Sequence, residues 1–364
     1  MNIFNQELIN KSITFLKNIK KSDRVAVIHH TDPDGISSGV LMCKLIERLR
    51  GKQPDLRHNQ PGIIHGFTDE TLELLKSDKI NKVITTDISP DENYENWKDV
   101  EEFAEILIVD HHPLIYEETD RTIILKPQLF QKDILPVRYC AAKLVYDLAS
   151  YLVDMSDLDW IASIGIIGDV ASPAWEDFLD KTFKKYNFVK GKDWFDSILG
   201  KTASTMSCAE CYDESLIPKV FGILYRAKTP EEIINSELKQ FKEIIQEEIQ
   251  YWIKNLNEKA EFYPEIETIY YKITPKHHVK SSISTNLGIK FPNKTIFIVS
   301  EENDLMLISA RRGDFKKSVN DILKKAIINI PDAQAGGHIP AAGARVPKQY
   351  YEVFKKRLLE VLHE

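Results

Sequence analysis

The chain has 364 residues, of which 43% are hydrophobic and 28% are charged. This is the composition of an ordinary folded protein, and the length suffices for two domains with separate cores. The formal net charge of −7 argues against a protein that coats nucleic acid without specificity. No apolar run approaches the roughly 20 residues that span a bilayer. The N-terminal stretch contains acidic and polar residues, as in MNIFNQELINKSITFLKNIKK, so we expect no signal peptide and a cytoplasmic location.

Short apolar runs alternate with helical patterns in the first half of the chain. The runs cover 24–30, 82–88 and 106–110. The helical patterns cover 37–50, 69–77, 93–104, 140–153 and 157–168. This alternation predicts βαβ units and therefore a doubly wound, mainly parallel α/β sheet.

The second half begins with a charged amphipathic pattern over 229–260, in which Pro230 suits the first turn of a helix. We predict one long helix here that connects two domains. Beyond it the alternation restarts, with strands near 266–273, 295–300 and 304–310 and helices near 317–328 and 348–362. We therefore expect a first domain over 1–228, a linker helix over 229–260, and a smaller α/β domain over 261–364.

Four apolar runs of the first domain end in carboxylate or imidazole side chains, and we expect all four ends to be strand ends. In chain order these side chains are His30, Asp32, Asp34, Asp87, Asp110, His111, His112 and Asp169. The carboxyl ends of adjacent parallel strands meet in one crevice. A lone aspartate at such a place is usually a helix cap or a turn residue. Four such ends in order favour a common site instead.

So many carboxylates and imidazoles in one crevice would repel one another unless cations neutralised them. The set contains no thiolate, which favours Mn²⁺ or a similar octahedral ion over structural zinc. Two such ions bridged by a carboxylate can bind phosphoryl oxygens and activate a water. We therefore expect two divalent metal ions and phosphate hydrolysis, with Mg²⁺ or Co²⁺ as alternatives to Mn²⁺.

The second domain contains a glycine-rich segment, Ala335-Gly336-Gly337-His338, followed by Ile339-Pro340-Ala341-Ala342-Gly343. Consecutive glycines let backbone N–H groups approach an anion closely. Upstream, a strand ends in Arg311 and Arg312, and a guanidinium can bind a phosphate through two hydrogen bonds. A plain tight turn would explain the glycines alone. Together with the first crevice they favour a site for substrate phosphate.

These residues resemble the DHH phosphoesterase superfamily, which is named for Asp110-His111-His112. The other three runs match its catalytic motifs, and residues 261–364 resemble its DHH-associated domain. The segment around His338 matches the motif GGGHxxAAG, with Ala335 in place of the first glycine.

The resemblance implies a role for each matching residue. The metal ligands would be His30, Asp32, Asp34, Asp87, His111 and Asp169. Of these, Asp34 and Asp87 are the candidates for contacting both metals, and the spacing of His30 is shorter than in some relatives. Asp110 would orient an imidazole, and His112 would face the scissile phosphate. The second domain would bind substrate through Arg311, Gly336, Gly337 and His338.

The compact motif HTDPDG at His30–Gly35 most resembles archaeal RecJ-like single-strand exonucleases. This resemblance implies a single-stranded DNA or RNA substrate and a GINS-type replication partner. One alternative is a phosphodiesterase of short oligonucleotides or cyclic dinucleotides. Another is a non-catalytic, Cdc45-like replication scaffold, which the complete set of metal-ligand positions disfavours.

Overall fold

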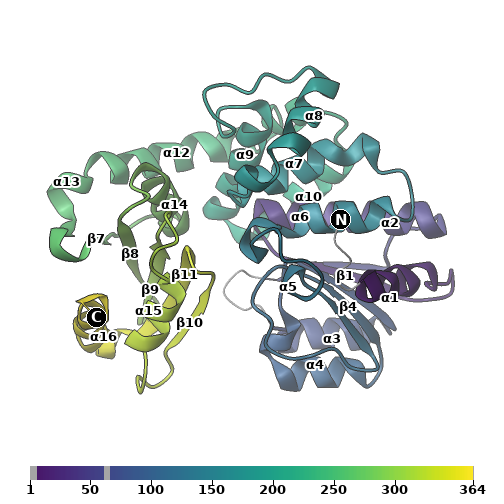
Figure 1. The fold of residues 1–364 in the computed structure, drawn as a ribbon, viewed down its shortest axis with the longest axis horizontal. Helices are drawn as coiled ribbons and strands as arrows, with labels where there is room; N and C mark the ends of the chain where they lie inside the picture. Colours follow the sequence, from purple (N-terminus) through teal and green to yellow (C-terminus); the bar gives the residue numbers. More distant parts are fainter. Residues whose placement is uncertain (1–5, 61–65, 364) are drawn as a thin grey trace. The chain divides into compact units, whose positions relative to one another are not determined.

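The structure is a computed structural model that describes residues 6–60 and 66–363 (Figure 1). Residues 1–5 of the N-terminal stretch considered above therefore lie outside the described residues. The chain divides into two compact units. Unit 1 comprises Met1–Glu210 and Glu214–Lys242, and unit 2 comprises Cys211–Asp213 and Glu243–Glu364. Among the described residues, no helix is long and apolar enough to cross a membrane.

Over its described residues, unit 1 is built on five parallel strands in the order β2-β1-β3-β4-β5. The strands are β1 (Val25–His29), β2 (Leu56–Asn59), β3 (Lys82–Thr86), β4 (Glu105–Val109) and β5 (Thr122–Leu125). The register pairs Ile28 with Thr85 and Thr85 with Ile108, so the central strands end at the same level. The predicted doubly wound, parallel sheet is confirmed. The two edge strands, β2 and β5, were not predicted from the sequence.

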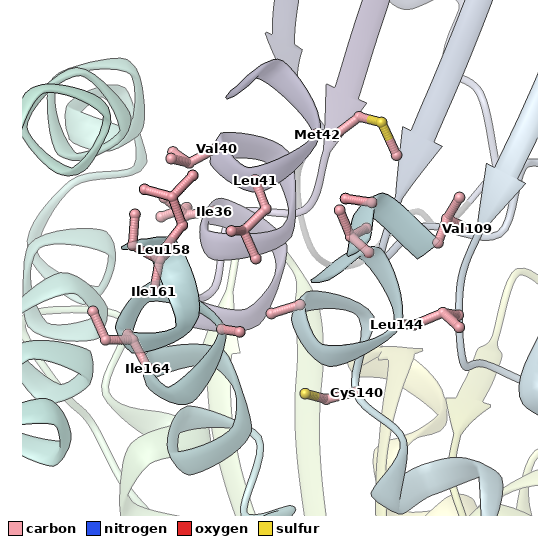
Figure 2. Packing of buried hydrophobic residues seen from close by; sticks show 14 of the residues in the cluster. Ile36, Val40, Leu41, Met42, Val109, Cys140, Leu144, Leu158, Ile161 and Ile164 are labelled. Atoms are coloured by element: carbon pink, nitrogen blue, oxygen red, sulfur yellow. The ribbon is translucent and has the colours of Figure 1, made fainter. Parts of the chain in front are cut away.

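Helices cover both faces of this sheet, as a parallel sheet requires. Alternate side chains of β1 point to opposite layers: Val25 and Val27 belong to one apolar cluster, and Ala26 and Ile28 belong to another. The helices that contribute to the first cluster include α1 (Gln6–Lys17), α2 (Pro33–Arg50), α6 (Ala141–Ser150) and α7 (Asp159–Gly168). Those that contribute to the second are α3 (Asp69–Ser77) and α4 (Tyr94–Glu101). Figure 2 shows the first cluster, where α2 packs against α7.

The predicted linker helix over 229–260 is not one continuous helix. It consists of α11 (Pro230–Ile234), α12 (Lys239–Lys254) and α13 (Leu256–Lys259). The first break lies at Ser236, whose hydroxyl donates to the Ile233 carbonyl and accepts from the Leu238 amide. A serine side chain that bonds its own backbone competes with helical hydrogen bonds, which explains the interruption. The remaining helices of unit 1 are α5 (Pro127–Phe130), α8 (Glu176–Tyr186), α9 (Ile198–Tyr212, which continues into unit 2) and α10 (Ile217–Arg226).

Unit 2 is built on six strands in the order β10-β11-β9-β8-β7-β6. They are β6 (Glu261–Tyr263), β7 (Thr268–Lys272), β8 (Thr295–Glu302), β9 (Leu305–Arg311), β10 (Gln334–Gly337) and β11 (Ala341–Pro347). Only β7 and β8 are parallel; the other neighbouring pairs are antiparallel. Its helices are α14 (Lys280–Lys290), α15 (Val319–Ala326) and α16 (Tyr351–His363). The glycine-rich segment lies in a β-hairpin formed by β10 and β11.

Gly165 in α7 generates a stability prediction. A Cβ at this position would lie 2.4 Å from the Ala142 Cβ and 2.6 Å from Asp34 Oδ1. Replacing a helical glycine by alanine ordinarily stabilises a helix by about 1 kcal/mol. For Gly165→Ala we expect the opposite, a loss of about 1–3 kcal/mol in the free energy of unfolding, because the new methyl group overpacks α7 against α6 and α2.

Urea unfolding would measure this change, with Gly222→Ala in α10 as the matched control. A Cβ at Gly222 would meet only the guanidinium end of Arg226, at 3.3 Å. We expect the control to be neutral or stabilising. An equal change in the free energy of unfolding for the two variants would contradict the close packing at Gly165.

Candidate metal centre

Side chains that follow three neighbouring strands of unit 1 come together at the carboxyl end of the sheet. β1, β3 and β4 are adjacent, and the residue after each strand still bonds its neighbour. The His30 amide donates to the Thr86 carbonyl at 3.3 Å, and the Asp87 amide donates to the Val109 carbonyl at 3.1 Å. The parallel register thus brings together the ends that the sequence predicted to meet.

The motif after β1 begins α2. Asp32 is its N-cap, and Asp32 Oδ1 accepts a hydrogen bond from the Gly35 amide at 2.8 Å. Gly35 is required because a Cβ there would lie 2.4 Å from the His30 Cβ. His30 Nδ1 lies 3.2 Å from Asp32 Oδ1. Asp32 therefore both caps the helix and faces the imidazole.

Asp34 is buried in the first turn of α2 and is held by the start of α6. Its Oδ2 and Oδ1 accept hydrogen bonds from the amides of Ala141 and Ala142 at 2.7 and 2.9 Å. A helix N-terminus favours a carboxylate. Burial nevertheless raises the pKa of Asp34 well above its usual value, and the charges of Asp87 and Asp169 add to that rise.

Asp87 lies between two histidines at the end of β3. Its backbone is left-handed, with φ 62°, a conformation that aspartate tolerates better than most residues. Asp87 Oδ2 lies 3.5 Å from His30 Nδ1, and Asp87 Oδ1 lies 3.3 Å from His111 Nε2. Burial raises the pKa of Asp87, but these imidazoles outweigh it and hold the pKa below its usual range. Asp87 is therefore the anion around which the two histidines gather.

Asp169 follows α7, so its predicted position at a strand end is wrong. The segment before it, 159–168, is helical, because its apolar residues pack α7 into the core between other helices. Asp169 Oδ2 is buried and accepts no hydrogen bond from any residue in the described parts of the chain. It lies 3.9 Å from His111 Nδ1. Burial raises the pKa of Asp169 to about 7, with the charge of Asp87 contributing.

Asp110 is fully buried, and neighbouring side chains occupy both of its oxygens. His112 Nδ1 contacts Oδ1 at 2.7 Å. Ser89 donates to Oδ2 at 2.6 Å, and Lys126 Nζ lies 3.1 Å from the same oxygen. Asp110 therefore has the contacts of a residue that orients an imidazole rather than those of a metal ligand. Ser89 and Lys126 were not predicted from the sequence, since a serine or lysine at a strand end is ordinarily exposed.

The residues present fit divalent cations. Among the described residues of unit 1, ligand atoms lie within 4.8 Å of one another in four overlapping groups: His30, Asp32 and Asp87; Asp34, Asp87 and His111; Asp34, Cys140 and Asp169; and Asp87, Asp110 and His112. Asp87 belongs to three of these groups and Asp34 to two. Carboxylate and imidazole donors suit Mn²⁺ and Mg²⁺. Burial raises the pKa of the Cys140 thiol well above its usual value, so the thiol stays protonated and is a poor ligand. A bound cation would give the buried Asp169 Oδ2 a partner.

The substrate residues predicted in unit 2 lie at one end of its sheet. Ala341 is paired with Arg311 across β11 and β9, and Gly337 is paired with Ala342 across the hairpin. Gly337 has φ 131°, which requires glycine. The Arg311 guanidinium donates to Thr285 Oγ1 at 3.2 Å and to the Ala310 carbonyl at 3.0 Å. The hairpin turn holds His338, whose amide donates to the Ala341 carbonyl at 2.7 Å.

Arg312 does not join this group. Its side chain is buried, and its guanidinium bonds Asp314 at 2.7 and 2.9 Å and Glu267 at 2.8 Å. These two carboxylates neutralise its charge. Arg312 is therefore not available to bind a phosphate, and Arg311 remains as the candidate.

Comparisons with known proteins give the same assignment for the first domain. Residues 24–168 match the family model described as the N-terminal domain of the DHH family. An uncharacterized protein of Methanocaldococcus jannaschii is 29% identical over 175 residues, which cover 46% of this chain and 38% of that protein. The chain thus matches well under half of that relative's length.

Two solved structures share the fold. One is the DHH domain of a member of a family of ribosomal proteins, with a TM-score of 0.76 at 18% identity over 98% of this chain and 91% of that chain. The other is RecJ from Thermus thermophilus in complex with Mn²⁺, with a TM-score of 0.72 at 16% identity over 100% of this chain and 55% of that chain. At these identities the likeness establishes the fold.

The raised pKa values generate a prediction about metal affinity. Below about pH 7 Asp169 carries a proton, and the nearby carboxylates hold the pKa of His111 well above its usual value against the effect of burial. A divalent cation must displace these protons. We therefore expect Mn²⁺ affinity to fall as the pH is lowered from 8 to 6, by about tenfold per pH unit for each proton released.

Titration calorimetry in buffers of different ionisation enthalpy would count the protons released on Mn²⁺ binding. Asp169→Asn should release fewer protons than the wild type. An affinity that does not change between pH 6 and 8 would contradict this electrostatic arrangement.

Proposed function

Because residues 24–168 carry the N-terminal domain of the DHH family, we propose that this protein is a metal-dependent phosphodiesterase. Its substrate would be single-stranded DNA or RNA, from which it releases nucleotides as a RecJ-like exonuclease, with a GINS-type replication protein as a candidate partner. The observation that carries the proposal is the gathering of Asp34, Asp87, His111 and Asp169 at one sheet edge, with Asp34, Asp87 and His111 all buried. Such a cluster of carboxylates needs cations.

In this proposal two divalent ions, Mn²⁺ in the first instance, would be held by His30, Asp32, Asp34, Asp87, His111 and Asp169, whose ligand atoms lie close together. The ions would supply Lewis acidity toward the phosphoryl oxygens and lower the pKa of an attacking water.

The chain's own residues would orient the reacting groups. The amides of α6 fix both oxygens of Asp34, and the carboxylate of Asp87 lies within 3.5 Å of the imidazoles of His30 and His111. His112 contacts Asp110 through Nδ1, so it would approach the scissile phosphate through Nε2. In unit 2, the guanidinium of Arg311, the imidazole of His338 and the glycine-rich hairpin at Gly336 and Gly337 would bind another phosphate of the substrate.

The described residues favour an enzyme over a Cdc45-like scaffold. Every residue expected to hold metal lies in a group of closely spaced donors. A scaffold has no need of several buried carboxylates, which are costly without cations. The choice between long single strands and short oligonucleotides or cyclic dinucleotides depends on substrate length, which the experiment below varies.

The test is a time course of hydrolysis in Mn²⁺ on single-stranded DNA and RNA of graded length, labelled at either end. We expect progressive shortening from one end. We expect Asp87→Ala and His111→Ala each to lower the rate by at least about 10³-fold, because they remove residues that act as one unit with the cations. Circular dichroism would show that the variants remain folded.

Glu105→Ala is the matched control, since this carboxylate pairs with Lys82 at the start of β4, at the opposite end of the sheet. Its rate should equal that of the wild type. Cleavage confined to substrates of a few nucleotides would replace the exonuclease proposal with the oligonucleotide phosphodiesterase. Full activity of Asp87→Ala would remove this cluster from the reaction.

A further inference from the structure

Lys126 directly follows β5 and has a fully buried side chain. Its ammonium group lies among oxygens of four residues: Ser89 Oγ at 3.0 Å, the Pro113 carbonyl at 3.0 Å, Asp110 Oδ2 at 3.1 Å and Asp91 Oδ1 at 3.2 Å. An ammonium group has three protons. Lys126 is therefore surrounded by enough acceptors to hold its Nζ in one place.

The sheet brings Lys126 to this position. Leu125 is paired with Val109, and the Asp110 amide donates to the Leu125 carbonyl at 3.2 Å. The next residue of each strand, Lys126 and Asp110, is consequently side by side with the other. Burying both charges is expensive, and an apolar pair of similar volume is often as stable or more stable. Stability alone therefore does not account for a lysine at this position.

The contacts of Asp110 indicate what the lysine does. One carboxylate oxygen, Oδ1, contacts His112 Nδ1 at 2.7 Å, while Ser89 and Lys126 hold the other oxygen. A carboxylate held at Oδ2 cannot rotate, so its Oδ1 fixes the plane of the imidazole and keeps the proton on Nδ1.

The backbone around His112 is tied to the same group. Lys126 bonds the Pro113 carbonyl, and Asp91, its second carboxylate partner, accepts a hydrogen bond from the Ile115 amide at 3.1 Å. Gln128, two residues beyond Lys126, donates to the His112 carbonyl at 3.0 Å. Both the ring and the main chain of His112 thus depend on the segment that follows β5.

We propose that Lys126 is a positioning residue that fixes Asp110 and, through it, the imidazole of His112 for contact with the scissile phosphate. The kinetic part of this inference rests on the proposed function. The orientation of the His112 ring can be tested without any activity.

The kinetic experiment is a double-mutant cycle between Lys126→Met and His112→Ala, measured in Mn²⁺ on the best substrate of the wild type. In the wild-type background we expect Lys126→Met to lower kcat by about 10- to 100-fold, with KM within about twofold. In the His112→Ala background it should have little further effect, because the group that it positions is gone. Equal losses of kcat in the two backgrounds, or full kcat in Lys126→Met, would overturn the proposal.

Ser89→Ala covers the case in which Lys126→Met does not fold. It removes a donor to the same Asp110 oxygen without leaving a buried charge unpaired, and we expect kcat to fall by about threefold to tenfold, again only when His112 is present. Lys82→Met is the matched control: Lys82 is a largely buried lysine whose ammonium lies 2.7 Å from Glu105, at the start of β3. Its kcat should be unchanged.

Nitrogen-15 NMR of histidine-labelled, metal-free protein gives the test that does not require turnover. In the wild type the His112 ring should carry its proton on Nδ1, and Lys126→Met or Ser89→Ala should shift the ring toward a mixture of tautomers. An unchanged tautomer in both variants would overturn the role of Lys126. A wild type that cleaves none of the substrates but shows these ring changes would instead contradict the proposed function alone.

Discussion

The carboxylates buried at the carboxyl end of the unit 1 sheet repel one another. Neighbouring imidazoles and backbone amides offset part of this repulsion. Asp34, Asp87 and Asp110 are each at most 2% exposed, and unpaired buried charges cost several kcal/mol each. Burial raises the pKa of Asp34 and Asp169, whereas the flanking imidazoles hold that of Asp87 down. The protein groups alone therefore do not balance the negative charge of the cluster. This is the physical reason for assigning cations to it.

Backbone amides donate hydrogen bonds to two of these carboxylates. Helix N-termini at α2 and α6 direct amides at Asp32 and Asp34, and these amides fix the carboxylates without neutralising them. Such contacts leave oxygens available for a metal ion while preventing the side chains from turning away. The strand ends thus bring the carboxylates together, and the helix N-termini hold two of them in place.

Asp110 is treated differently from the other carboxylates. Lys126, which directly follows β5, neutralises it, and Ser89 and His112 contact its oxygens as well. This end of the sheet therefore contains two kinds of acid: those that we assign to cations, and Asp110, whose two oxygens contact neighbouring side chains. A buried lysine distinguishes them.

The amino-acid sequence by itself determined the parallel sheet and most of the cluster of carboxylates and imidazoles at its carboxyl end. Apolar runs that end in His30-Thr31-Asp32, Asp87 and Asp110-His111-His112 must converge, because parallel strands joined by helices all end at one edge. Only the tertiary structure decided where the other groups lie. Asp169 enters from the end of a helix, Lys126 is buried beside Asp110, and the glycines at 336 and 337 lie in a hairpin. These placements depend on packing between segments far apart in the chain, and local periodicity contains no information about such contacts.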